Sequence, residues 1–188
     1  MSPPVQYLVG SRLYLRPVEE TDLPACQRWI NHPDIRQYLL TVFPFDAQAE
    51  RAWWEGLDRG NPPSGVILAI VLHDGDRLIG TTGLVAIDWL NRSAETGTLI
   101  GEQDSWGQGY GTEAKELLLE YSFDTLALHR VHSRTFEFNE RSAKHLLRTG
   151  FVQEGRQRDA VFRNGEFHDI LLYGVLADAW RARRAPSA

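Results

Sequence analysis

The stretch "WGQGYGTEAKELLLEYSF", residues 106–123, joins a cluster of glycines to a helical pattern. After Gly111, apolar residues recur at the spacing of one helix face, which predicts a helix that begins near Thr112. The glycines would lie at its N-terminus, where free backbone N–H groups and the helix dipole favour a phosphate group. Gly107, Gly109 and Gly111 carry no Cβ, so a diphosphate could approach their amides. A tight strand-to-helix turn would also need glycine, and the pattern alone leaves both interpretations open.

Strand and helix patterns alternate along the rest of the chain. Strands are expected at residues 11–18, 66–72, 78–87, 94–100, 131–138, 161–163 and 167–173, and further helices at 21–30, 46–57 and 139–149. The dipeptides Asp74-Gly75 and Asn164-Gly165 are typical of hairpin turns. We therefore expect a single α/β domain over residues 1–180, followed by a flexible basic tail at 181–188.

The composition narrows the classes of function. A chain of 188 residues with 43% hydrophobic and 24% charged residues has the size and balance of one globular domain. Its net charge of -5 argues against binding to nucleic acid, which needs a basic face. The longest apolar run, residues 66–72, is too short to span a membrane, and no secretory signal is visible, so we expect a cytoplasmic location. The single cysteine, Cys26, excludes an internal disulfide and agrees with that location.

Several separated motifs resemble those of one enzyme superfamily. The glycine stretch resembles the acyl-CoA diphosphate loop of the GNAT superfamily, the acetyl-CoA-dependent N-acetyltransferases. In chain order, the segments "LRPVEETDLPACQRWINHPDI", "SAETGTLIGEQDSWGQGYGTEA", "NERSAKHLLRTGF" and "EGRQRDAVFRNGEFHDILLYGVL" resemble the RimJ/RimL branch of that superfamily. The resemblance covers roughly residues 10–180, and ordered motifs are more specific than the glycines alone.

The resemblance implies a fold and a place for acetyl-CoA. The expected fold is a mixed, mostly antiparallel twisted sheet with helices on both faces and a splayed central strand pair, and the co-substrate would lie in the cleft between these two strands. Backbone groups of the strand end would hold the pantetheine arm, the loop amides would hold the diphosphate, and two residues of the "NERS" motif would contact the pantetheine. The expected binding residues are Leu99, Ile100, Gly101, Trp106, Gly107, Gln108, Gly109, Tyr110, Gly111, Thr112, Asn139 and Ser142.

Two positions depart from the pattern of the superfamily. Trp106 stands where the loop usually begins with Arg or Gln, and this removes a polar side-chain contact while the glycine amides remain. Leu146 stands where many relatives carry a tyrosine that protonates the leaving thiolate. Ser142 is the nearest substitute for that tyrosine, and a thiol with a pKa of about 8.5 leaves tolerably well without a strong acid. Asn139 could equally serve only as a helix N-cap.

The acceptor amine also needs a base, because it attacks only when neutral. By its place in the resemblance, Glu95 is the candidate, acting directly or through water. The alternative is a strand carboxylate that pairs with a basic neighbour such as Arg92. Of the two tryptophans in the second expected helix, we expect Trp54 to contact the substrate and Trp53 to pack in the core. No metal is expected, because His129, His132, His145 and His168 show no ligand spacing.

These observations predict an enzyme that transfers an acetyl group from acetyl-CoA to a primary amine. By resemblance to RimJ/RimL, the favoured acceptor is a protein or peptide N-terminus. A polyamine, an aminoglycoside or an amino-sugar is the alternative acceptor, and a non-catalytic acyl-CoA-binding module is the alternative class. No nucleic-acid or membrane partner is expected, and the hairpin at Asn164-Gly165 could serve a homodimer.

Overall fold

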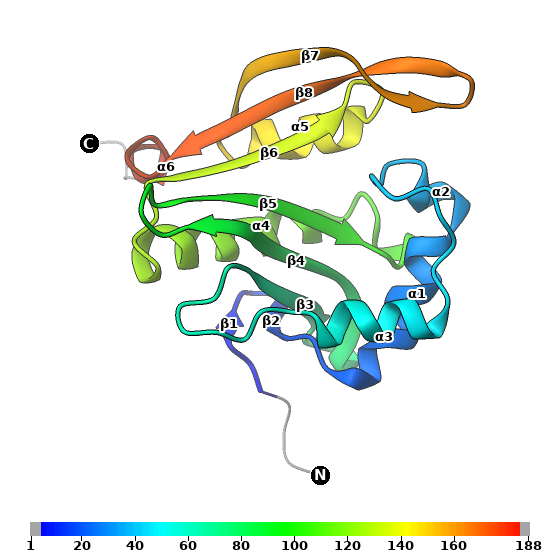
Figure 1. Cartoon of the computed structure of the whole chain (residues 1–188). Helices are drawn as coiled ribbons and strands as arrows, with labels where there is room; N and C mark the ends of the chain where they lie inside the picture. Colours follow the sequence, from blue (N-terminus) through cyan, green and yellow to red (C-terminus); the bar gives the residue numbers. More distant parts are fainter. Residues whose placement is uncertain (1–4, 185–188) are drawn as a thin grey trace.

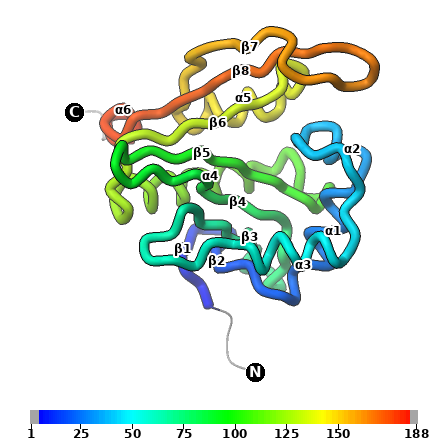
Figure 2. The backbone as a smooth tube through the Cα atoms, in the orientation of Figure 1, coloured from blue at the N-terminus to red at the C-terminus, as the bar shows by residue number. Residues whose placement is uncertain are grey.

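The computed structural model describes residues 5–184, which form one eight-stranded sheet with helices on both of its faces (Figures 1 and 2). The strands are β1 (Leu8–Val9), β2 (Leu13–Pro17), β3 (Val66–Leu72), β4 (Arg77–Asp88), β5 (Ser93–Ile100), β6 (Arg130–Phe136), β7 (Val152–Arg163) and β8 (Glu166–Leu176). The α-helices are α1 (Leu23–Asn31), α2 (Pro33–Arg36), α3 (Ala47–Glu55), α4 (Tyr110–Glu120), α5 (Glu140–Arg148) and α6 (Ala177–Arg184). Short helical turns lie at η1 (Glu20–Asp22), η2 (Asp74–Asp76), η3 (Gln103–Ser105) and η4 (Tyr121–Thr125). None of the described helices is long and apolar enough to cross a membrane.

The sheet is mixed, as the resemblance implied. Its strand order is β1-β2-β3-β4-β5-β6-β8-β7, and every neighbouring pair is antiparallel except β5 and β6. Two parallel neighbours cannot be joined by a tight turn, and α4 makes the long crossover between them. The glycine-led helix therefore starts at one end of this parallel pair.

The parallel pair is joined over only a short length. Its partners are Ser93↔Arg130, Ala94↔Val131 and Glu95↔His132, and no further pair follows. Beyond Glu95, β5 stays paired with β4 as far as Ile100, while β6 stays paired with β8 as far as Phe136. Figure 1 shows β5 and β6 diverging from this join, so the expected splayed strand pair is present at the centre of the sheet.

Alternation along the strands produces two apolar layers. On one face, Leu15, Ile79 and neighbouring residues pack against Leu118 of α4 in the main core. On the other face, Tyr14 and its neighbours pack against α3, and a separate cluster around Trp29 of α1 covers the end of β5. Each face of β5 is thus covered by a different set of helices.

Several element boundaries differ from expectation, and two short elements were not expected. Helix α4 begins at Tyr110, two residues before the predicted start. Strand β7 begins at Val152 instead of 161, and its residues 153–159 are polar or glycine and mostly exposed because it forms the sheet edge, so no apolar alternation marks them. Strand β1 and helix α2 were not expected, and both are short.

The C-terminal tail was expected to begin at residue 181, but helix α6 continues to Arg184. Its arginines form ion pairs with acidic residues of α4 and of the turn after it: Arg181 with Asp124, Arg183 with Glu116, and Arg184 with Glu120. These contacts give the basic residues a structured place on the domain. The remaining residues of the expected tail, 185–188, lie outside the described part of the chain.

Candidate active site

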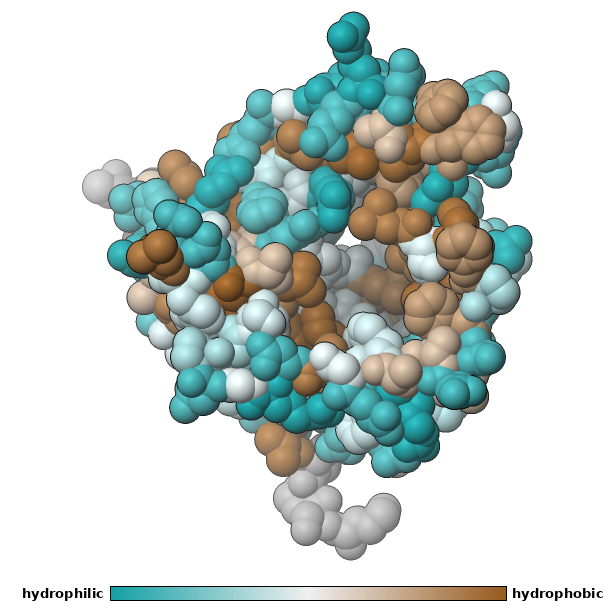
Figure 3. All heavy atoms as spheres, in the orientation of Figure 1, coloured by the Kyte–Doolittle hydropathy of each residue, from teal (hydrophilic) through white to brown (hydrophobic). Residues whose placement is uncertain are grey.

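A cavity with a volume of about 580 Å³ lies where β5 and β6 separate. It is bounded by the two strands, the N-terminal turn of α4, helix α5 and side chains from the α2–α3 region. Figure 3 shows this face of the molecule hollowed at its centre, with hydrophobic side chains around the opening. The splayed strands thus open onto a cleft of substrate size.

The free edge of β5 presents alternate backbone groups to this cleft. Ser133 Oγ donates to the Thr96 carbonyl oxygen at 2.9 Å, and the Trp106 indole donates to that of Ile100 at 2.7 Å, so these residues face the gap. Since alternate residues of a strand point their backbone groups the same way, Thr98 faces the gap as well.

The other two residues expected to hold the pantetheine arm point their backbone groups towards β4. The Gly101 N–H donates to the Ile79 carbonyl oxygen at 2.8 Å. The Leu99 carbonyl oxygen would lie 2.1 Å from a Cβ at Gly80, which places it on the β4 side. Of the three expected residues, Ile100 alone faces the gap, and Thr98 is the residue that the sequence analysis missed.

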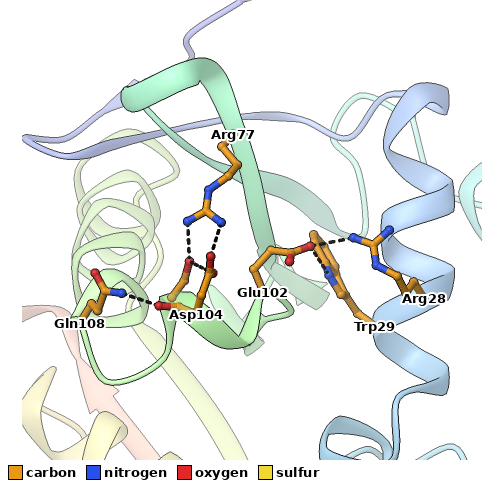
Figure 4. A network of polar contacts seen from close by, with 7 residues as sticks. Arg28, Trp29, Arg77, Glu102, Asp104 and Gln108 are labelled. Atoms are coloured by element: carbon orange, nitrogen blue, oxygen red, sulfur yellow. Dashed lines mark hydrogen bonds and ion pairs between the residues drawn. The ribbon is translucent and has the colours of Figure 1, made fainter.

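Packing explains the glycine at position 101. A Cβ on Gly101 would lie 1.9 Å from the ring of Trp29, so only glycine lets this indole cover the strand end. The indole is held there by Glu102, which accepts hydrogen bonds from Trp29 Nε1 at 2.9 Å and from Arg28 at 2.7 Å (Figure 4). Gly101 therefore shapes one wall of the cleft through its missing side chain.

The glycine loop presents a cluster of free amides. Gly107 and Gly109 have φ values of 75° and 83°, and Gly109 is the N-cap of α4. A Cβ at Gly107 would meet nothing within 4 Å, and one at Gly111 would make only ordinary contacts. Within residues 5–184, no amide from Gly107 to Gly111 donates a hydrogen bond. Free amides at a helix N-terminus, with open space in front of them, fit the diphosphate of an acyl-CoA.

Side chains on both flanks fix this loop. Arg12 donates to the Gln108 carbonyl oxygen at 2.8 Å, pairs with Glu113 at 2.7 Å and lies over the Tyr110 ring. On the other flank, the Gln108 side chain donates to the Asp104 carbonyl oxygen, as Figure 4 shows. The loop is therefore held in shape before any ligand binds, which lowers the entropic cost of binding.

Further contacts hold the neighbouring turn. Arg77 pairs with Asp104 at 2.7 Å (Figure 4), and the Arg141 guanidinium lies 4.1 Å from the centre of the Trp106 ring. The indole at position 106, which lacks the polar contact usual in the superfamily, thus ties the loop to β5 and to α5. Thr112 follows the loop in the first turn of α4 and also lines the cleft.

Helix α5 brings the "NERS" residues to the cleft. The Asn139 side-chain oxygen accepts a hydrogen bond from the Ser142 amide at 3.1 Å, so Asn139 caps the helix as the alternative interpretation held. Both residues also line the cavity, and capping leaves the Asn139 amide group available to a ligand. Leu146, 2% exposed, belongs to the core and to the cavity wall and offers no proton.

Glu95 lies at the point where the strands part. Its carboxylate, 24% exposed, pairs with Arg134 of β6 at 2.8 Å and lines the cavity. The neighbour suggested by sequence, Arg92, instead donates to the Ala127 carbonyl oxygen. Because strand residues alternate between faces, Glu95 lies on the face covered by α1–α3, opposite to α4.

The expected places of the two tryptophans in α3 are reversed. Trp54 packs against Tyr14 and Val18, its indole donates to the Val18 carbonyl oxygen, and it does not line the cavity. Trp53, 37% exposed, does line the cavity. The cause is the orientation of α3, which turns Trp54 towards the sheet and leaves its neighbour at the cleft.

Sequence reasoning missed two titratable residues on the opposite wall. Lys115 of α4 is 1% exposed, its Nζ donates to Thr96 Oγ1 at 2.6 Å, and burial lowers its pKa to about 7. Burial first, and then the charges of Lys115 and Arg148, lower the pKa of His145 in α5 to about 4. The spacing carried one signal: Lys115 lies four residues before the buried Leu119 and therefore on its helix face.

No group of three or more His, Cys, Asp or Glu side chains in the described residues is arranged to hold a metal ion.

Comparisons with known proteins agree with this site. A family model described as "Acetyltransferase (GNAT) domain" matches residues 12–152. The chain is 36% identical to "Putative ribosomal N-acetyltransferase YdaF" of Bacillus subtilis over 78% of this chain and 73% of that protein. It is 28% identical to the spermidine N(1)-acetyltransferase of Vibrio cholerae over 93% of this chain and 99% of that one.

The likeness extends to the fold. The crystal structure of spermidine N-acetyltransferase from Vibrio cholerae in complex with CoA and spermine has a TM-score of 0.83, with 24% sequence identity over 92% of this chain and 99% of that one. Its fold and that of this chain are the same. From the family match, the relatives and the free amides at the head of α4, we conclude that the chain belongs to the GNAT acetyltransferase family and is an acetyl-CoA-dependent N-acetyltransferase.

Proposed function

We propose that this enzyme acetylates the N-terminal amine of a protein or peptide. The observation that carries the proposal is the charge of the cleft. Among the described residues that line it, Glu95 is the one carboxylate, while Lys115, Arg134, Arg141 and Arg148 contribute positive charge. Lys115, Arg141 and Arg148 belong to the α4–α5 side, and Arg134 pairs with Glu95, so the acceptor side has no spare carboxylate. A ligand with one ammonium group and an uncharged body suits such a lining better than a polyamine, whose several ammonium groups would lack partners.

The apolar side of the cleft suits the body of a peptide. The opening is lined on the α2–α3 side by five apolar or aromatic residues: Ile35, Tyr38, Leu39, Leu40 and Trp53. Their surfaces can cover the first side chain of a peptide, while the strand edges supply hydrogen-bonding groups. The printed name of one relative, "Putative ribosomal N-acetyltransferase YdaF", supports the same class of acceptor and the RimJ/RimL branch.

Chain groups on the α4–α5 side would hold acetyl-CoA, which supplies the acetyl group as an activated thioester. The amides from Gly107 to Gly111 would take the diphosphate, and the backbone of Thr98 and Ile100 would hold the arm along β5. Asn139 and Ser142 would contact the arm from α5. With both substrates held in one cleft, positioning supplies a large part of the rate.

Glu95 would accept the proton of the acceptor amine, directly or through water. Its ion pair with Arg134 holds the carboxylate at the point where β5 and β6 part. Keeping an amine neutral at pH 7 costs about 1.4 kcal/mol for an α-amino group with a pKa near 8, against roughly 4.6 kcal/mol for a lysine-like amine near 10.4. An α-amino acceptor therefore demands less of a general base than a lysine-like amine does.

A polyamine is the second candidate, because one relative over nearly the whole chain is a spermidine N(1)-acetyltransferase. The cytoplasmic location and a homodimer through the β7–β8 hairpin remain predictions.

The test measures thiol release from acetyl-CoA with peptides that begin with Ser, Ala or Met, with spermidine and with an aminoglycoside. We expect turnover with at least one peptide and none with the same peptide blocked at its N-terminus, even when it contains an internal lysine. Turnover with spermidine alone would overturn the proposal and assign the polyamine instead. A Gly111→Glu variant, whose affinity for acetyl-CoA should fall sharply, controls for contaminating activity.

A further inference from the structure

The wall of the cleft formed by α4 and α5 contains a buried amine to which the proposed function gives no task. Lys115 is 1% exposed, and among the described residues its Nζ makes one hydrogen bond, to the Thr96 hydroxyl. The Thr96 hydroxyl accepts this hydrogen bond from Lys115 and donates its own hydrogen to the Gly83 carbonyl oxygen at 2.7 Å. The amine therefore lies in the cleft wall with no carboxylate beside it.

An unpaired buried cation is costly, and folded proteins rarely keep one without a partner. The groups that face Lys115 from other elements offer it no negative charge. From β5 it meets the Thr96 hydroxyl, and from α5 it lies near His145, whose pKa the charge of Lys115 helps to lower. His145 Nε2 is itself buried and has no hydrogen-bond partner among the described residues. This part of the cleft therefore favours a ligand group that carries negative charge.

The position of Lys115 along β5 identifies that ligand group. Ile100 lies beside the head of α4, since its side chain would be 3.6 Å from a Cβ at Gly111. Thr96 is four residues further along the strand, a distance of about 13 Å. The pantetheine arm contains two amide units and ends in sulfur, so its reach is comparable to an extended peptide of about four residues. An arm that starts at the loop amides thus brings its sulfur to Thr96, where the strands close.

The reaction needs a proton donor beside the sulfur of the bound co-substrate. The sulfur acquires negative charge as the thioester bond breaks, Leu146 offers no proton, and the Ser142 hydroxyl is a far weaker acid than a thiol. We propose that Lys115 is a catalytic residue whose ammonium group lies beside the sulfur of bound acetyl-CoA and donates a proton to the departing thiolate. This inference rests on the proposed placement of the co-substrate.

The step balances as follows. The lone pair of the acceptor nitrogen forms the new N–C bond, and the C–S bond breaks with its electron pair going to sulfur. Lys115 Nζ gives a proton to that sulfur and becomes a neutral amine, while the excess proton on the new amide nitrogen leaves to Glu95 or water. Lys115 then takes up a proton from solvent through the open cleft. Its pKa of about 7 suits this cycle, because the amine can both release and regain a proton near neutral pH.

His145 lies close enough to Lys115 to be affected by its charge, and it also lines the cleft. Because its pKa is about 4, the ring is neutral at pH 7 and adds no second positive charge beside Lys115.

The experiment compares Lys115→Met with Lys144→Met, which changes the chain's other lysine, an exposed residue paired with Glu140. Methionine has nearly the length of lysine without its charge, so Lys115→Met should fold, and thermal unfolding checks this. The first readout is independent of turnover: the ultraviolet absorbance of the thiolate in the complex with CoA, titrated against pH. We expect the bound thiol in wild type to titrate about one unit or more below its free value of about 8.5, because a cation lies beside it.

In Lys115→Met the bound thiol should titrate at or above its free value, and kcat should fall about 10²-fold with loss of its decline at high pH. Lys144→Met should match wild type in both readouts. An unchanged thiol titration in Lys115→Met, in protein that still binds CoA, would overturn this inference and leave the proposed function intact. Failure of wild type to bind CoA or acetylate any peptide would instead overturn the proposed function.

Discussion

The two faces of strand β5 differ in how they are built. The face towards α4 and α5 uses backbone groups and buried polar atoms, with the free amides after Gly107 at one end and Lys115 at the other. The face towards α1–α3 uses side chains from several segments, among them Glu95, Leu39 and Trp53. In the proposed arrangement, the first face binds acetyl-CoA, whose structure does not change with the acceptor. The second is an apolar surface whose side chains can change without disturbing the sheet, so it is where acceptor specificity can vary.

The largest effect is expected from a negative charge introduced on the face of β5 that uses backbone groups. Gly111 has ordinary backbone angles and room for a side chain, so Gly111→Glu should fold. Its carboxylate would meet the diphosphate, and we expect acetyl-CoA affinity to fall about 10³-fold, because like charges in contact cost several kcal/mol. Calorimetric titration measures this, with Gly111→Gln as the control of equal size and smaller effect. Wild-type affinity in Gly111→Glu would mean that the diphosphate binds elsewhere.

A change on the other face should affect turnover and leave donor binding alone. For Glu95→Gln we expect kcat to fall about 10²-fold, because the amide cannot accept the amine proton. The effect should be larger at lower pH, where more of the amine is protonated, and acetyl-CoA affinity should stay unchanged. A pH profile of kcat that matches wild type would remove Glu95 from the reaction. Arg134→Met, which frees the carboxylate from its ion pair, serves as the companion variant.

The neighbouring tryptophans of α3 separate substrate contact from packing. For Trp53→Ala we expect the KM of the peptide to rise about tenfold, with acetyl-CoA affinity and thermal stability nearly unchanged. For Trp54→Ala we expect the free energy of unfolding to fall by about 3 kcal/mol, because its ring packs against Tyr14 and Val18. Peptide kinetics and chemical denaturation check both. A stable Trp54→Ala variant with a raised KM would restore the sequence-based assignment.

The smallest effect concerns stability in acid. The pKa of His145 is about 4 in the folded protein, below its value of about 6.5 in an unfolded chain. As the pH falls from about 6.5 to about 4, the unfolded chain binds a proton that the folded state refuses, so wild type loses stability across this window. At about pH 5.5 the loss from this residue is about 1 kcal/mol. His145→Leu should not show this loss, whereas His129→Leu, at an exposed position, should keep it. Equal acid slopes in both variants would contradict the burial of His145.

The same comparison explains what the sequence could predict. The free amides follow from a local rule, glycines before a helical pattern, and the strand and helix around them follow from apolar spacing. Lys115 was missed because Ala114 belongs to the core face of the helix, and a lysine that directly follows such a residue is expected to point to solvent. Only the packing of α4 against β5 shows that Lys115 is buried. The two tryptophans were exchanged because helical spacing fixes which residues share a face but not which way the helix turns. The polar start of β7 carries no alternation, so its length depends on pairing with β8.

The short join between β5 and β6 also bears on self-association. An unpaired strand edge at the rim of a sheet invites another chain to add a strand, and this is a common route to aggregation. Here Thr98 and Ile100 expose such an edge inside the molecule, with β6 facing it and α4 and α5 behind it. A slender arm can enter this gap, but a second folded copy cannot. The protein can therefore keep hydrogen-bonding capacity ready for its co-substrate without making that capacity a hazard while the co-substrate is absent.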